Sequence, residues 1–568
     1  MADIITDSLV DQYTTPNPLR ALSDLADDIE KRLGIRPVRA HLGNPTGPIY
    51  APAIDAMIAS LEERKQELEH TRAPEHADGF TGGYAHHTGD KRMRREVAEA
   101  VRTIDGLPEG ALDENNTFAC NAGTGGLNAV FAVARPGSVI FAPEPTYPAW
   151  QKIAGRYGHR IVGYPLNEAD RFLPQAEAIK ELMDRNPPQE GGTNIVLYHY
   201  PHNPSGKTLN ESEARQVADT MKDVVHHRPN SLLVQEDIYL ATTHPDDAIF
   251  TPSQFMKDEE TLRHLVVIHS MSKMGHPQER TGVIAIPNRD VARYIGGAIS
   301  FLTLGSSSTD FIGIARTLAH IAGGGLLPQG QSPDKENHRY KVAKYYQDRL
   351  QVISRGLFDL EKKLETQGIQ PGHILAELNP DLAVKEGEEY LKRTPRGTYY
   401  LFPDFRVLKG QEIPQVFRAE PAMQEYFARK WQKIQEKAKA EGRPVPPGDT
   451  LPEELRKIDC ADDIAAMLAN AHCLGLRPLT VAPGGIVPGR RPRRAGILHA
   501  AAACRDRAGA APGARDAARR GADPRIRRQG RIAARRGAER AQRRRRRGQY
   551  PDRPRRCRVR QGPRRHRL

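Results

Sequence analysis

Between about residue 90 and residue 290, the spacing of the apolar positions alternates between two patterns. Short runs rich in β-branched and aliphatic residues are separated by turn residues from stretches with helical spacing. Several short runs are apolar without interruption, as in strands that are covered on both faces. The expected strands are TFAC (117–120), SVIFA (138–142), RIVGY (160–164), NIVLYHY (194–200), SLLVQE (231–236), HLVVIHS (264–270) and GVIAIP (282–287). The pattern predicts an α/β fold with a mainly parallel, seven-stranded sheet flanked by helices.

Helical spacing fills the intervals between these strands and continues beyond residue 290. The expected helices are 91–104, 124–134, 172–185 and 211–225, with a longer one at 339–368. The run GTYYLFPDF (397–405) is a predicted strand, so the later part of the chain is expected to form a smaller α+β domain. Residues 406–460 are rich in charge and proline, and they are predicted to be an insertion with one exposed helix at 422–442.

Charge separates the last part of the chain from the rest. The whole sequence has 84 Lys and Arg against 70 Asp and Glu, a formal net charge of +14. Residues 481–568 contain 29 Arg, no Lys and 5 acidic residues, so they carry +24, whereas residues 1–480 carry −10. The body is therefore acidic, and nucleic acid is not expected as its partner. The expected organisation is an N-terminal arm that joins the small domain (1–50), a large domain (51–325), a small domain (326–483) and an arginine-rich tail (484–568).

The tail has too few apolar residues to bury a core and is expected to be disordered. An arginine-rich arm could grip the phosphates of nucleic acid or an acidic partner, with Arg543–Arg547 as its centre of charge. Arg, Ala, Gly and Pro are, however, the residues that GC-rich codons encode when they are read out of frame. Because the composition changes in the middle of a motif, just after Gly485, we favour a frameshifted gene end over a binding arm.

The five cysteines form no CxxC pair and have no Cys/His spacing typical of a metal site. They predict neither a disulfide framework nor a bound metal, and they suit a reducing, cytoplasmic setting. The N-terminus is acidic and polar, and no window of about 18 apolar residues occurs along the chain. Neither secretion nor a membrane partner is therefore expected.

The segment from Ser270 to Gly282 lies between two predicted buried strands and carries a lysine. Burial lowers the pKa of an ammonium group, which makes a lysine a better nucleophile for Schiff-base chemistry. On its own, Lys273 could equally leave the strand end toward water. Two serines precede Lys273 and Arg280 follows it, and hydroxyls with a guanidinium at the carboxyl ends of parallel strands make a phosphate site.

This Ser-x-Ser-Lys segment, with its later Arg-x-Gly, resembles the cofactor-lysine motif of the fold-type-I pyridoxal-phosphate enzymes, the aspartate aminotransferase-like class I and II group. The interval from Lys273 to Arg280 is similar to that of valine–pyruvate aminotransferases, although Gln278 stands where they have glycine. The resemblance, which runs from about residue 40 to 485, implies that Lys273 binds pyridoxal 5'-phosphate as a Schiff base. The residues that it implies for the cofactor phosphate are Gly123, Thr124, Ser270, Ser272 and Arg280.

Three more segments carry the resemblance around the cofactor ring. Tyr147, in Pro-Thr-Tyr-Pro, matches the aromatic residue that stacks on the pyridine. Asn203, in Asn-Pro-Ser-Gly, and Tyr239 match the two donors to the phenolic oxygen of the cofactor. The family also has an aspartate three residues before this tyrosine, which keeps the pyridine nitrogen protonated. Here Glu236 stands at that position and Asp237 follows it, so both remain candidates, with Glu236 favoured.

Two segments near the N-terminus match elements that bind the partner subunit or the substrate. Tyr84, in Gly-Tyr-Ala-His-His-Thr-Gly, resembles a tyrosine that reaches the phosphate of the neighbouring subunit, which implies a homodimer. Gly43 resembles the glycine whose backbone meets the substrate carboxylate. In the family, an arginine after a Pro-Gly turn binds the same carboxylate. Here Pro483 and Gly484 are followed by the tail, so no such arginine is assigned.

The resemblance implies a transaminase that exchanges an amino group between an L-amino acid and a 2-oxo acid in ping-pong steps. The bond that breaks at the substrate's α-carbon depends on which substituent stands perpendicular to the cofactor ring. A lyase or decarboxylase reaction on the same fold therefore remains an alternative. Nucleic-acid binding through the tail is a third, less favoured hypothesis.

Overall fold

The computed structural model describes residues 45–70, 86–303, 307–324, 334–366, 372–406, 409–413 and 421–440, with a few isolated positions besides. All of them belong to one compact unit, Met1–Val487. Gly43, Tyr84 and the arginine-rich tail lie outside the described residues. Within the described ranges, every helix is too short or too polar to cross a bilayer.

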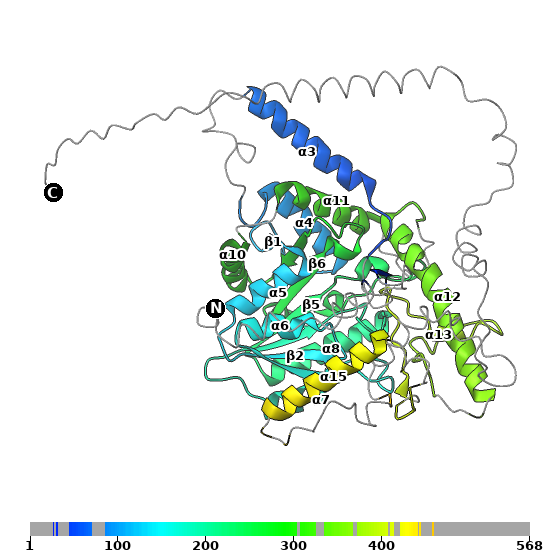
Figure 1. Ribbon diagram of the computed structural model, residues 1–568. Coiled ribbons are helices and arrows are strands. Elements are labelled where there is room, and N and C mark those ends of the chain that lie inside the picture. The colour runs from blue at the N-terminus through cyan, green and yellow to red at the C-terminus, as the bar shows by residue number, and fades with distance from the viewer. Residues whose placement is uncertain are drawn as a thin grey trace, which may run out of the picture. The chain divides into compact units, whose positions relative to one another are not determined.

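The centre of the molecule is a seven-stranded sheet in the order β1-β7-β6-β5-β4-β2-β3 (Figure 1). The strands are β1 (Thr117–Cys120), β2 (Val139–Glu144), β3 (Arg160–Pro165), β4 (Asn194–Tyr198), β5 (Ser231–Glu236), β6 (Leu265–Ser270) and β7 (Gly282–Ala285). Neighbouring strands are parallel except at β7, which runs antiparallel to both β1 and β6. The predicted α/β fold with a mainly parallel, seven-stranded sheet is confirmed.

The reversed strand β7 brings three chain segments together at one edge of the sheet. Its first residue, Gly282, pairs with Cys120 at the end of β1 and with Ser270 at the end of β6. A side chain at Gly282 would place its Cβ 2.8 Å from the carbonyl oxygen of His269 and 2.8 Å from the carbonyl carbon of Ala122. The edge that holds the carboxyl ends of β1 and β6 therefore also holds the start of β7, in close backbone contact.

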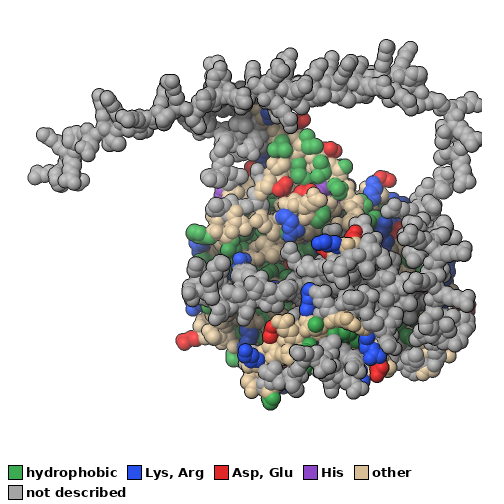
Figure 2. All heavy atoms as spheres, in the orientation of Figure 1, with side chains coloured by type: hydrophobic (Ala, Val, Ile, Leu, Met, Phe, Trp, Pro, Cys, Tyr) green, Lys and Arg blue, Asp and Glu red, His purple; other side chains and the backbone are tan. Residues whose placement is uncertain are grey.

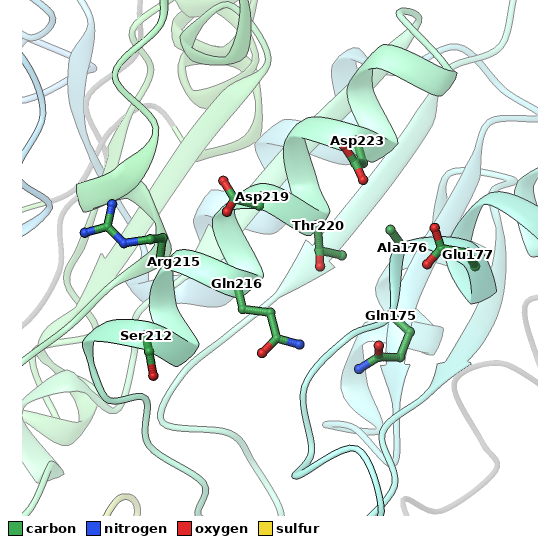
Figure 3. Close-up of a pocket in the computed structure, with 9 residues that line it drawn as sticks. All are labelled: Gln175, Ala176, Glu177, Ser212, Arg215, Gln216, Asp219, Thr220 and Asp223. Carbon is green, nitrogen blue, oxygen red and sulfur yellow. The ribbon is translucent and has the colours of Figure 1, made fainter.

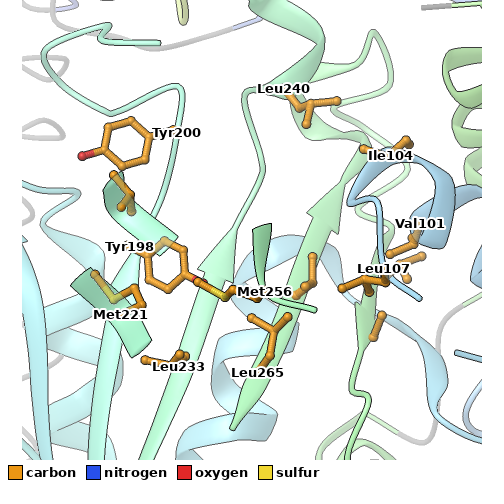
Figure 4. Close-up of a cluster of buried hydrophobic side chains, with 14 of the residues drawn as sticks. Val101, Ile104, Leu107, Tyr198, Tyr200, Met221, Leu233, Leu240, Met256 and Leu265 are labelled. Atoms are coloured by element: carbon orange, nitrogen blue, oxygen red, sulfur yellow. The ribbon is translucent and has the colours of Figure 1, made fainter. Parts of the chain in front are cut away.

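Two layers of helices cover the sheet and define two buried faces. The α8 face packs on α4 (Lys91–Ile104), α7 (Ala176–Arg185), α8 (Glu211–His227) and α11 (Ser308–Gly324). The α5 face packs on α5 (Ala122–Val133), α6 (Ala149–Arg156) and α10 (Arg289–Thr303). Figure 4 shows the core of the α8 face, which includes Leu233 and Leu265 from the strands and Val101 from α4. Period-two alternation along each strand assigns successive side chains to the two faces.

The helices begin where the sequence supplies N-cap side chains. The Asp90 carboxylate accepts the N–H groups of Arg92 and Met93 at the start of α4. Asn210 and Glu213 form a reciprocal capping box at the start of α8. An additional helix, α3 (Ala51–His70), packs against α11. Short turns of helix connect the strands: η2 (Leu240–Thr242), η3 (Pro252–Phe255), α9 (Glu259–Leu262) and η4 (Met271–Lys273).

Beyond the sheet, the described chain is mostly helical. The helices are α12 (His338–Thr366), α13 (Tyr390–Arg393) and α15 (Pro421–Ala440), so the two helices predicted here are confirmed within two residues. The predicted strand at 397–405 is wrong, because this described segment contains no strand. Thr398 has a φ of 60°, and the N–H of Gly397 donates to the carbonyl of Gly206. The segment therefore docks on loops of the large sheet instead of pairing with another strand.

On the face shown in Figure 2, basic and acidic side chains are interspersed. The described residues on this face form no continuous basic patch. The arrangement agrees with the net negative charge of residues 1–480.

Candidate active site

Lys273 stands at the edge of the sheet where β6 ends. The short helix η4 begins directly after this strand, and the Ser270 side chain caps it by accepting the N–H of Ser272 at 3.2 Å. This turn directs the Lys273 Nζ over two aromatic rings, 5.2 Å from the centroid of Tyr399 and 5.8 Å from that of Tyr239. Lys273 is therefore held in a mostly apolar, aromatic setting.

This setting changes the acidity of the lysine. Burial and, to a smaller extent, the positive charge of Arg280 together lower the pKa of Lys273 to about 8. An ordinary lysine has a pKa of about 10.4. The neutral amine, which is the nucleophilic form, is thus populated near neutral pH.

Three polar side chains from the same loop form a group next to Lys273. The Ser270 hydroxyl lies 3.0 Å from the Ser272 hydroxyl, and Arg280 Nη1 donates to Ser272 Oγ at 2.9 Å. The N-terminus of α5 lies at the same edge, because Ala122 contacts Gly282. Two hydroxyls, a guanidinium and a helix N-terminus are a chemically suitable set for a phosphate.

Glu236 enters the site from the end of β5, on the α5 face. A Cβ added at Gly123 would lie 3.2 Å from Glu236 Oε1 and 2.5 Å from Ile238 Cδ1, so the glycine keeps the space beside this carboxyl clear. Burial raises the pKa of Glu236 to about 8. Trp150 of α6 opposes this rise, although its Nε1 has no well-formed hydrogen bond among the described residues. Without a ligand, Glu236 is therefore neutral at pH 7.

Tyr147 lies at the border between this site and solvent. Its side chain is 39% exposed, the largest exposure among the predicted ring-binding residues that the structure describes. Burial of the rest of the ring raises the pKa of Tyr147, and the nearby Glu236 carboxyl adds to this rise. The ring thus offers a flat face close to Glu236.

Asn203 and Tyr239 meet directly. Asn203 Nδ2 donates to the Tyr239 hydroxyl at 3.1 Å, and the hydroxyl of Tyr400 lies 3.2 Å from the same oxygen. Burial raises the pKa of Tyr239 well above its ordinary value. The two predicted donors are therefore neighbours, joined by a third hydroxyl from the docked segment 397–405.

Asp237 does not join this group. It follows Glu236 on the opposite face of the sheet, where Gln235 Nε2 donates to its Oδ2 at 2.6 Å. The same amide nitrogen donates to Asp105, and His269 Nε2 lies 2.7 Å from Asp105 Oδ2. Burial and the Asp105 carboxylate both raise the pKa of Asp237 well above the usual range.

This Asp105–Asp237–His269 cluster combines residue types that ligate divalent metals, with candidate ligand atoms within 4.8 Å of one another. Both Asp105 oxygens already accept hydrogen bonds, from Gln235 and Ser253 on one side and from His269 on the other. Burial raises the pKa of Asp237, and its Oδ1 and His269 Nδ1 have no hydrogen-bond partner among the described residues. We interpret the cluster as a buried hydrogen-bond network, centred on Asp105, that stabilises the α8 face.

A separate hollow of about 420 Å³ lies between α7 and α8 (Figure 3). It is lined by Gln175, Ala176, Glu177, Ser212, Arg215, Gln216, Asp219, Thr220 and Asp223. These side chains are polar or charged apart from Ala176, and none of the predicted site residues is among them. The hollow is therefore distinct from the Lys273 site.

Three site residues could not be found from the sequence pattern. Tyr399 and Tyr400 belong to the segment that was expected to be a strand, and Trp150 lies on the unpredicted helix α6. Tyr239 and Tyr400 are 161 positions apart, and only the docking of segment 397–405 brings their hydroxyls together. The double tyrosine in GTYYLF was the available signal, but a short apolar run typical of a strand explained it equally well.

Residues 54–319 match the family model described as Aminotransferase class I and II. This stretch, just under half of the chain, is therefore similar to class I and II aminotransferases. The crystal structure of the aspartate aminotransferase from Rhizobium meliloti shares this fold, with a TM-score of 0.53 and 16% sequence identity over 71% of this chain and 84% of that one.

The curated relatives match this chain over only part of its length. The 1-aminocyclopropane-1-carboxylate synthase 2 of Solanum lycopersicum is 26% identical over 191 residues, which cover 32% of this chain and 38% of that protein. An aspartate aminotransferase of Pyrococcus horikoshii is 25% identical over 162 residues, covering 27% and 39%. The chain thus spans about two fifths of the length of these curated relatives.

Class I and II aminotransferases use pyridoxal 5'-phosphate, and the residues present fit this group. The lysine has a depressed pKa, as Schiff-base chemistry needs, and a phosphate-type set of donors lies beside it. The missing side chain at Gly123 leaves space in front of a buried carboxyl, which suits a flat ring with a basic nitrogen.

Proposed function

We propose that this aminotransferase fold carries out transamination between an L-amino acid and a 2-oxo acid, with Lys273 as the residue that binds pyridoxal phosphate. The observation that carries the proposal is the environment of Lys273. The lysine is buried among aromatic rings with its pKa lowered to about 8, and Arg280 lies beside it with Ser272.

The other residues are proposed for the roles that the family resemblance implies for them. For the cofactor phosphate we propose Gly123, Thr124, Ser270, Ser272 and Arg280. For the cofactor ring we propose Tyr147 as the stacking residue, with Asn203 and Tyr239 as donors to its phenolic oxygen. Gly43 for the substrate carboxylate and Tyr84 for the partner subunit's phosphate remain proposals from the sequence, and with Tyr84 goes a proposed homodimer.

Glu236 is our choice over Asp237 for the pyridine nitrogen. It shares the α5 face with Gly123 and Tyr147, whereas Asp237 is engaged with Gln235 on the α8 face. Burial alone would keep Glu236 neutral, so a basic ring nitrogen beside it would take its proton and form a buried ion pair.

The bound cofactor would supply an electron sink for the bond that breaks at the substrate's α-carbon. Lys273 Nζ, free as an amine once a substrate has replaced it, would carry the α-proton. Its low pKa favours this role, because a general base works best when its pKa is near the operating pH. The aromatic side chains of Tyr239 and Tyr399 would keep water away from the lysine.

A lyase or decarboxylase reaction on the same fold is the second candidate. The match to a 1-aminocyclopropane-1-carboxylate synthase favours this second candidate, because the name of that relative does not describe the transfer of an amino group. A substrate screen distinguishes the two, because a transaminase needs a 2-oxo acid acceptor and the alternatives do not. The resemblance of the lysine motif to valine–pyruvate aminotransferases makes valine with pyruvate the first pair to test.

The test is to add pyridoxal phosphate to the purified chain and record its visible absorbance and its transfer of amino groups to pyruvate and 2-oxoglutarate. We expect a yellow protein whose bound chromophore is lost in Lys273→Ala. Lys257→Ala is the matched control, because Lys257 donates to the backbone carbonyl of Gly106 away from the site. A wild-type protein that binds no chromophore would overturn the proposed function.

A further inference from the structure

The segment that carries Tyr400 is fixed to the large sheet at several points. Arg396 makes a two-point ion pair with Asp247, with distances of 2.6 and 2.5 Å. The N–H of Thr398 donates to Thr242 Oγ1 at 2.9 Å, and this hydroxyl in turn donates to the carbonyl of Tyr239 at 2.6 Å. The N–H of Tyr400 then donates to Thr398 Oγ1 at 3.1 Å. Tyr400 is therefore held in a defined position relative to Tyr239 by a chain of short hydrogen bonds.

The Tyr239 hydroxyl has a limited number of hydrogen-bonding positions. Its oxygen can accept two hydrogen bonds and donate one. Asn203 Nδ2 occupies one acceptor position at 3.1 Å, and the Tyr400 hydroxyl is at 3.2 Å. If Tyr400 is the donor, both acceptor positions are filled and the hydrogen of Tyr239 is left to point elsewhere. If Tyr239 is the donor, its hydrogen is spent on Tyr400.

The proposed role of Tyr239 decides between these two arrangements. As a donor to the phenolic oxygen of the cofactor, Tyr239 uses its one hydrogen there, so its oxygen can only accept from the Tyr400 hydroxyl at 3.2 Å. Asn203 Nδ2 fills the other acceptor position at 3.1 Å.

We propose that Tyr400 is a positioning residue, which donates to the Tyr239 hydroxyl and so directs the hydrogen of Tyr239 toward the phenolic oxygen of the cofactor. The inference rests on the proposed function, since it presumes that pyridoxal phosphate binds at Lys273. Donation into the lone pairs of Tyr239 also polarises its O–H bond, because hydrogen bonds in a chain strengthen one another. Tyr400 then acts on the cofactor without touching it.

The expected consequence is spectroscopic. A hydrogen bond to the phenolic oxygen stabilises its anionic form and therefore lowers the pKa of the bound chromophore. Loss of the Tyr239 hydroxyl should raise this pKa by about 1 unit, the size of one hydrogen bond to a charged group. Loss of the Tyr400 hydroxyl removes only the polarisation and the orientation, so the expected rise is about 0.3 unit.

The experiment is a pH titration of the absorbance of the cofactor-loaded protein, for wild type, Tyr400→Phe, Tyr239→Phe and the double variant. Tyr157→Phe is the matched control, because it removes another partly buried hydroxyl with a 3.2 Å hydrogen bond, to Asn128, away from the site. Thermal unfolding of each variant shows whether the fold is kept.

If Tyr400 acts through Tyr239, Tyr400→Phe raises the chromophore pKa in the single variant but adds nothing in the Tyr239→Phe background. A pKa that Tyr400→Phe leaves at the wild-type value, or shifts equally in both backgrounds, would overturn the inference while leaving the proposed function standing. A wild-type protein without a chromophore would overturn both, and the same titration reveals this at its first step.

Discussion

Glu236 and Asp237 are consecutive acidic residues at the end of β5, yet they lie in two different environments. Glu236 faces the α5 side of the sheet, where Gly123 leaves space beside it. Asp237 faces the α8 side, where Gln235 binds it within a closed network around Asp105. The pKa of each carboxyl is raised by burial, but only Glu236 has room for a partner that could remove its proton. Burial raises the pKa of both carboxyls, but the two differ in whether a ligand can reach them. This access, and not the raised pKa, separates their expected functions.

The largest expected effect is on the α8 face, where the network around Asp105 holds Asp237. Asp105→Ala should lower the free energy of unfolding by about 3 kcal/mol, because His269, Gln235 and Ser253 would lose their buried hydrogen-bond partner. Asp113→Ala, which breaks an exposed pair with Arg289, is the control and should cost no more than about 1 kcal/mol. Denaturant unfolding measures both values. Equal losses for the two variants would mean that the closed network adds nothing to stability.

The next prediction separates the two carboxyls by cofactor affinity. Glu236→Ala should weaken the binding of pyridoxal phosphate by about 30-fold, since a charge-assisted hydrogen bond to the ring is worth about 2 kcal/mol. Asp237→Asn, which imitates the protonated acid, should leave the affinity within about threefold of wild type. Titration of the cofactor-free proteins, followed by absorbance, gives the dissociation constants. The reverse result would assign the pyridine nitrogen to Asp237.

The last prediction concerns the pH dependence of the side of the sheet that holds Lys273 and Glu236. The lowered pKa of Lys273 predicts that the rate of cofactor capture rises about tenfold per pH unit up to about pH 8 and then levels off. The amine is the reactive form, so the rate is low below this pKa and maximal above it. Stopped-flow absorbance between pH 6 and pH 11 measures the profile. A free lysine derivative is the control, with its midpoint near the ordinary value of about 10.4; the same midpoint in the protein would contradict burial as the cause.

Much of the sheet could be predicted, because uninterrupted apolar runs such as NIVLY have few alternatives to a covered strand. The reversal of β7 could not, since GVIA is as apolar as its parallel neighbours and carries no mark of direction. The prediction of a strand at 397–405 was wrong because the apolar side chains of this segment are covered without a sheet. Tyr399 and Tyr400 are covered by other tyrosines and not by a sheet. The Tyr399 ring lies 4.7 Å from the Tyr346 ring, and the Tyr400 ring meets the Tyr239 ring edge-on at 5.8 Å between centroids.

Part of the site was also within reach of the sequence. The alternation in SLLVQE puts Val234 and Glu236 on one face and Leu233 and Gln235 on the other, so the opposite orientation of Asp237 follows from the strand period. The contribution of Tyr400 did not follow, because it depends on a loop that docks from a distant part of the chain. The period of a strand predicts which face of the sheet a side chain is on. A contact between distant parts of the chain is found only in the structure.

The antiparallel course of β7 has a consequence for how the loop from Met271 to Thr281 can vary. Ser270 and Gly282, at its two ends, are paired in adjacent strands, so the loop leaves and re-enters the sheet at the same level. Residues added to or deleted from the middle of this loop would change only the conformation of that middle part. The paired strand ends would still keep Lys273 and Arg280 near one another. A sheet built in this way would tolerate a change of one residue in the lysine-to-arginine interval, because the distance is set by strand pairing and not by loop length.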